Sequence, residues 1–130
     1  MGEVDTIQRQ TDLIEAVLEL SKLEKLTTNS IKIHKTFYRL KQDFPKYFKS
    51  LMFDTNGHTP ISNEINNIFS ILTLSRFIDI GSDLRTYFIN KHRDKEYADG
   101  LREKGIEIPK VDGATLQNLA DKFDEYITKN

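Results

Sequence analysis

The chain has 130 residues, of which 38% are apolar and 30% charged, and its net charge at neutral pH is −1. These totals allow one domain with a modest core and exclude a disordered chain, while the absence of cysteine excludes disulfide and thiolate chemistry. No apolar run approaches the ~18 residues that a membrane span requires, and the acidic N-terminus does not resemble a signal peptide. We therefore expect a cytoplasmic protein that does not contact a membrane.

The first half of the chain is predicted to contain two helices. The first runs from about Asp5 to Leu26 and ends at a cluster of cap-forming residues, 27–30. The second has apolar residues at helical spacing and is stopped by Pro45. Residues 45–51 are predicted to add a short helical piece. The stretch from 22 to 50 carries eight basic and two acidic side chains, a local excess of positive charge.

The central stretch predicts a helix followed directly by a β-hairpin. Turn-forming residues at 54–59 precede the helix, and Ser62 or Thr59 is the expected N-cap. Its apolar positions follow helical spacing: Ile65, Ile68, Phe69 and Leu72. Residues 76–80 and 84–89 then alternate as two strands around a turn at 81–83.

The C-terminal part is predicted to be helical. A short helix from Lys95 to Lys104 should end at Gly105, since glycine fits the left-handed cap position. A last helix from about Ala114 to Thr128 carries one apolar stripe: Leu116, Leu119, Ala120, Phe123 and Ile127.

Four stretches along the chain form a recognisable pattern: Lys35–Leu40, Phe53, Pro60–Ile65 and Phe77–Ile78. They resemble a pattern of Lys-x-x-(Phe/Tyr)-x-Leu on one helix, then a Phe-containing link, then Gly-Pro-(Tyr/Phe)-Ser-x-Glu-(Leu/Ile) opening the next helix, and a short strand ending in Ile. That pattern is typical of a group of small prokaryotic winged-helix proteins whose function is poorly defined, and the chain resembles this group. The resemblance covers about residues 27–90, although Gly57 lies further from Pro60 than in the pattern and Ile61 replaces an aromatic residue.

We therefore predict a mainly α fold, a winged helix-turn-helix with a β-hairpin wing and additional N- and C-terminal helices. Residues 1–130 would form a single domain, with a winged-helix core at 27–91 and flanking helices at 1–26 and 92–130. Catalysis has little support. The three histidines are far apart without metal-ligand spacing, and Ser62 lies outside a Gly-x-Ser-x-Gly elbow. We expect no enzyme activity, no cofactor and no metal.

The predicted function is that of a small DNA-binding or regulatory protein. Asparagines on the central helix could pair with adenine in the major groove, and basic residues on neighbouring elements could contact phosphate. The candidate nucleic-acid-binding residues are Lys32, Lys35, Arg39, Asn63, Asn66, Asn67, Ser70, Arg76 and Arg85. Against this, no Lys or Arg lies between Met52 and Ser75, and phosphate neutralisation supplies much of the affinity for DNA.

The alternative is a non-enzymatic protein-interaction adaptor with the same fold, by analogy with small accessory proteins that phages, plasmids or archaea encode. In either case the apolar stripes of the terminal helices need cover, either on each other within one chain or across a two-fold axis between copies. We predict a homodimer through these helices, which Phe123→Asp would dissociate without unfolding the central domain.

Overall fold

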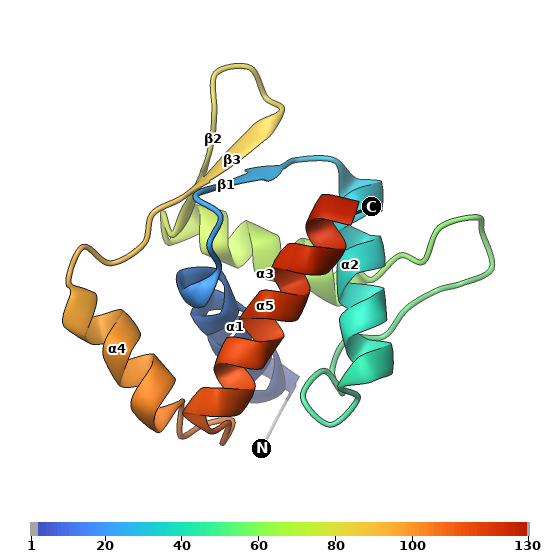
Figure 1. Cartoon of the computed structure of the whole chain (residues 1–130). Helices are drawn as coiled ribbons and strands as arrows, with labels where there is room; N and C mark the ends of the chain where they lie inside the picture. The colour runs from blue at the N-terminus through green and yellow to red at the C-terminus, as the bar shows by residue number, and fades with distance from the viewer. Residues whose placement is uncertain (1–2, 130) are drawn as a thin grey trace.

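The computed structural model describes residues 3–129, with side chains described from Thr6 onward. Met1 and Gly2, part of the N-terminal stretch judged above for a signal peptide, lie outside the described residues. The fold is mainly helical with one small antiparallel sheet (Figure 1). In chain order the elements are α1 (Glu3–Leu20), β1 (Lys25–Thr27), α2 (Ser30–Asp43), α3 (Asn63–Leu74), β2 (Ile78–Ile80), β3 (Thr86–Ile89), α4 (Lys95–Lys104) and α5 (Gly113–Lys129).

The sheet has the strand order β1-β3-β2, with both pairs antiparallel. The hairpin of β2 and β3 confirms the sequence prediction. β1 corrects the predicted first helix, which was expected to continue to Leu26 but ends at Leu20. In the sheet Leu26 lies opposite Tyr87 and buries its side chain in the core, so pairing with a distant strand prevails over local helical preference.

The helices α2 and α3 begin at the predicted caps. The side chain of Asn29 accepts a hydrogen bond from the Lys32 N–H, and that of Ser62 accepts one from the Ile65 N–H. Between the two helices, residues 45–51 form turns rather than the expected helical piece. Asp54 and Ile61 then pair as an isolated bridge that closes the turn-rich loop before α3.

The terminal helices belong to the same core as the central elements. α5 crosses the molecule in contact with α1, α2 and α4 (Figure 1). Six of the seven residues of the two predicted apolar stripes are buried within the chain, and Ile7 on α1 is half-buried: the six are Ile14, Leu18, Leu116, Leu119, Phe123 and Ile127. The intramolecular arrangement thus accounts for most of these stripes, and the homodimer through the terminal helices stays a prediction. Because Phe123 is buried, Phe123→Asp is expected to unfold the chain rather than dissociate copies.

The turn between α4 and α5 depends on two glycines. Gly105 ends α4 at φ 72°, as predicted, and a Cβ there would lie 1.8 Å from the Val111 carbonyl oxygen. A Cβ on Gly113 would lie 1.9 Å from the Arg102 carbonyl oxygen. Such approaches exclude any side chain, so the two helices are held close by backbone contact.

Candidate interaction surface

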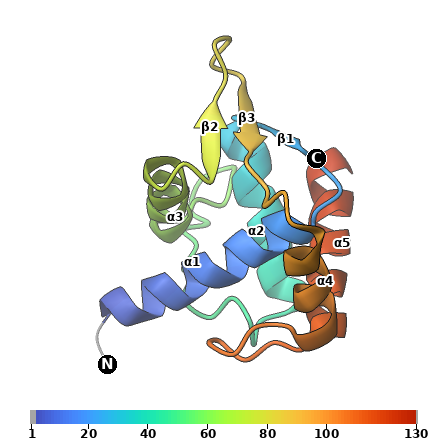
Figure 2. The same cartoon turned by 90° about the vertical axis from the view of Figure 1, so that its left-hand side faces the viewer.

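The outer side of α3 is an uncharged surface next to a groove. α3 lies at the edge of the molecule beneath the hairpin, with no other element over its outer side (Figure 2). A groove of about 580 Å³ separates it from the inner face of the hairpin. Its lining contains no charged residue: Asn66, Phe69, Ser70, Thr73, Leu74, Ile80 and Tyr87. We call this the α3–hairpin groove.

The rims of the α3–hairpin groove are apolar and open to solvent. Leu74, the last residue of α3, is 84% exposed, and Ile80 on β2 is about half exposed. Phe69 and Tyr87 form the floor, with ring centroids 5.8 Å apart. Exposed apolar groups beside a pocket are typical of surfaces that contact another molecule. Their exposure to water is unfavourable in free energy, and binding removes that exposure.

A second hollow, of about 390 Å³, lies at the other end of α3. The N-terminal residues Asn63 and Glu64 line it together with the bridged loop. Two large apolar side chains of that loop are exposed there, Met52 at 65% and Ile61 at 52%. We call this the N-terminal hollow. Exposed apolar groups therefore flank the helix at both of its ends.

Buried His34 fixes the position of α3 on α2. Its Nδ1 accepts a hydrogen bond from the Ser62 N–H at 2.9 Å, and its Nε2 lies 3.0 Å from Oδ1 of Asn66. Since Nδ1 is an acceptor, the proton of the neutral ring resides on Nε2 and is donated to Asn66. One imidazole thus holds both the cap and the first turn of α3. No local pattern indicates this role of His34, because its partners lie 28 and 32 residues away along the chain.

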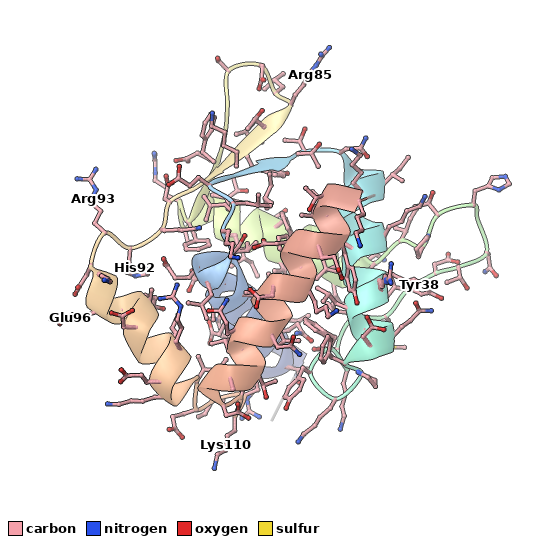
Figure 3. All side chains as sticks on the ribbon, in the orientation of Figure 1. Tyr38, Arg85, His92, Arg93, Glu96 and Lys110 are labelled. Atoms are coloured by element: carbon pink, nitrogen blue, oxygen red, sulfur yellow. The ribbon has the colours of Figure 1, made fainter. Side chains whose placement is uncertain are left out.

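All nine candidate nucleic-acid-binding residues are exposed. Four of them lie on α3: Asn63, Asn66, Asn67 and Ser70. Arg76 follows the last turn of this helix. Arg85 projects from the tip of the hairpin (Figure 3). The structure therefore brings the α3 and hairpin candidates onto neighbouring elements.

The α2 candidates are not part of this surface. The Arg39 guanidinium lies 4.3 Å from the ring centroid of Tyr126, so Arg39 faces α5. His34, by contrast, marks the side of α2 that faces α3. At about 100° per residue, Lys32 and Lys35 point roughly 160° and 100° away from His34. The basic residues of α2 are therefore separated from the asparagines of α3.

A charged junction between α1 and α4 lies away from the α3–hairpin groove. The carboxylate of buried Glu19 accepts hydrogen bonds from the His92 backbone N–H at 3.0 and 3.2 Å, and lies 2.6 Å from His92 Nδ1. The His92 ring stacks on Tyr97 at 3.9 Å. The partner of His92 thus lies 73 residues earlier in the chain.

Burial and nearby charges perturb titration at this junction. Desolvation and the neighbouring charge of Asp12 raise the pKa of Glu15 above its ordinary value. Desolvation and the charges of Glu15 and Glu19 likewise raise the pKa of Tyr97. Across the described residues no group of three or more His, Asp or Glu side chains could hold a metal ion, so this cluster has no metal-binding geometry.

The comparisons with known proteins give no relative. No protein-family model, curated protein or solved structure matches the chain. No helix within the described part of the chain is long and apolar enough to cross a membrane.

Proposed function

We propose that the chain is a non-enzymatic winged-helix module that binds another protein through α3 and the hairpin. The order helix, strand, helix, helix, hairpin, with β3 in the centre of the sheet, supports a winged helix. The resemblance of residues 27–90 to small winged-helix proteins adds to this support. Function then depends on the surface that the fold presents, because the same fold serves many partners.

The uncharged character of the α3–hairpin groove carries the proposal. None of its seven lining residues has a charge, and Leu74 and Ile80 expose apolar side chains on its rims. DNA backbones attract cationic surfaces, and every phosphate contact by Lys or Arg adds to affinity. An apolar groove instead gains free energy by removing its surface from water, which a protein partner with apolar side chains achieves.

DNA binding is the second candidate function. It is favoured by the exposure of Asn63, Asn67 and Ser70 along α3 and by Arg76 and Arg85 near its C-terminal end and the hairpin tip. Amide side chains on a helix can read adenine in the major groove. The two candidates therefore make opposite predictions for substitutions on α3.

Fluorescence anisotropy with a random-sequence duplex, at low and moderate salt, separates the two. If the chain is a protein-binding module, we expect Asn67→Ala to leave any low-salt affinity for the DNA duplex unchanged. The matched control Asn118→Ala on α5 should also leave this affinity unchanged. Weak binding by the lysines of α2 should fall with Lys35→Glu and with added salt. Loss of affinity on Asn67→Ala alone would overturn the proposal in favour of DNA recognition by α3.

Binding of an apolar fluorescent dye tests the groove itself. The parent chain should enhance the fluorescence of the dye, and the double variant Leu74→Ser with Ile80→Ser should reduce this signal without lowering the melting temperature. Both side chains are exposed, so their removal costs the fold little. A dye signal that is absent in the parent chain would mean that no accessible apolar groove exists.

A further inference from the structure

Four of the exposed residues of α3 form a row along the helix. Asn63, Asn67, Ser70 and Leu74 are spaced four, three and four residues apart, and none carries a charge. This is the spacing of a seam along which two helices pack against each other. The row is on the exposed side of α3, which itself lies at the edge of the molecule (Figure 2).

The two ends of this row complement each other. The C-terminal end projects Leu74, which is 84% exposed. The N-terminal end carries the N-terminal hollow, where Met52 and Ile61 expose apolar surface beside Asn63. Eleven residues separate Asn63 from Leu74, a distance of roughly 16 Å along a helix. A projecting apolar side chain is thus one helix length from a hollow that exposes Met52 and Ile61 and is also lined by the carboxylates of Asp54 and Glu64.

We propose that the partner of this surface is a second copy of the chain, with the two α3 helices packed antiparallel across a two-fold axis. This inference rests on the proposed function and names its partner. With the axis midway between Asn67 and Ser70, Leu74 of each copy lies opposite Asn63 of the other. It then fills the other copy's N-terminal hollow. Because of the two-fold symmetry, the contact between Leu74 and the N-terminal hollow occurs twice, as in any isologous interface.

Charge supports the same arrangement. Arg76 follows Leu74 by two residues, and Asp54 is bridged to Ile61, which precedes Asn63 by two residues. Antiparallel packing therefore brings each exposed Arg76 close to the exposed Asp54 of the other copy. Among the described residues neither side chain belongs to an ion pair within the chain. The uncharged row between these ends presents no like charges to repel its copy.

Dimerisation of this kind covers the residues that DNA recognition requires. Asn63, Asn67 and Ser70 would lie in the interface and be withdrawn from the major groove. Ser70 and Leu74 belong both to the row and to the lining of the α3–hairpin groove, so the second copy would cover this rim of the groove and bring Phe69 and Tyr87 to the edge of the interface.

Sedimentation from about 1 to 300 µM tests the proposal with a matched pair of leucines. Leu84 at the hairpin tip is 73% exposed, nearly as much as Leu74, but lies outside the proposed interface. The parent chain and Leu84→Lys should dimerise alike. Leu74→Lys should raise the dissociation constant at least ~10-fold, because each dimer loses two apolar contacts. Unchanged dimerisation of Leu74→Lys would overturn the proposed interface.

Charge exchange and cross-linking give independent readouts. Arg76→Asp and Asp54→Arg should each weaken the dimer, and the two together should restore it. The chain has no cysteine, so Ser70→Cys provides a single thiol near the proposed axis and should form a disulfide-linked dimer on oxidation. Ser82→Cys, in the hairpin turn, should not. A parent chain that remains monomeric at every concentration would contradict the proposed dimer. Failure of the proposed function has a different readout, namely a DNA affinity that falls on substitution of Asn67.

Discussion

The outer side of α3 and the junction between α1 and α4 differ in which side chains they expose and which they bury. On α3, apolar side chains such as Leu74 are exposed and contribute little to the fold. At the junction, a charged side chain, Glu19, is buried and bonded to His92. An exposed apolar group gains by contact with another molecule, whereas a buried charge is tolerated only when it is paired. The first region is thus suited to binding, and the second holds the chain together.

Substitutions on the two faces of α3 should differ most in their effect on the stability of the chain. Leu72 is buried, and Leu72→Ala should lower the free energy of unfolding by about 2–5 kcal/mol through lost burial and a residual cavity. Leu74→Ala, two residues later, should change it by less than ~0.5 kcal/mol. Urea unfolding of both variants measures the difference. A cost below ~1 kcal/mol for Leu72→Ala would mean that the inner face of α3 is not part of the core.

The junction should be broken by removal of its buried carboxylate. Glu19→Ala leaves the His92 backbone N–H without its acceptor and removes the contact with the His92 ring, so we expect a loss of about 1–3 kcal/mol. Glu96→Ala, an exposed carboxylate on the neighbouring α4, is the control and should stay within ~0.5 kcal/mol. Equal stabilities for the two variants in thermal unfolding would contradict a structural role for Glu19.

Removal of the N-cap side chain of α3 should lower the stability of the chain by a smaller amount. Ser62→Ala removes the acceptor of the Ile65 N–H and should cost about 1 kcal/mol. Ser70→Ala, in the exposed row of the same helix, should be nearly neutral, since its hydroxyl donates only to the Asn66 carbonyl oxygen. Chemical unfolding separates the two serines. If Ser70→Ala costs as much as Ser62→Ala, the outer row contributes to the fold and the contrast between the regions fails.

The smallest predicted effect depends on pH. Because the pKa of Glu15 is raised in the folded chain, folding favours its protonated form and stability falls as pH rises from the ordinary value to the folded one. Glu15→Gln should therefore stabilise the chain at pH 7, by less than ~1 kcal/mol because the group is partly exposed. The advantage should vanish below the ordinary pKa of about 4.3. Melting temperatures at pH 3.5 and 7 provide the measurement, and a parent chain more stable than Glu15→Gln at pH 7 would refute it.

Local signals predicted much of the fold. Caps at Asn29 and Ser62, the stop at Gly105 and helical spacing all act within a few residues, so the helices and the hairpin could be read from the sequence. β1 could not, because a three-residue strand exists only through pairing with residues 86–88, about sixty positions later. For the same reason His34 and Glu19, whose partners are remote, were not recognised as buried polar anchors.

The candidate site was predicted only in part. The exposed asparagines of α3 followed from helical periodicity, and they are where the spacing indicated. Arg39 was grouped with them by sequence distance, but contact with Tyr126 turns it toward α5. The hollow beside Asn63 depends on the bridge between Asp54 and Ile61, which no periodic pattern reveals.

The packing of α5 on α1 has a consequence for synthesis on the ribosome. The apolar face of α1 that contains Ile14 and Leu18 is synthesised about a hundred residues before α5, the helix that covers it. Until α5 has been made, the nascent chain therefore carries an uncovered apolar helix, a state that favours aggregation or chaperone binding. A chain that lacks the part of α5 from Phe123 onward would leave that face open permanently, and it would be a substrate for proteolysis rather than a smaller working module.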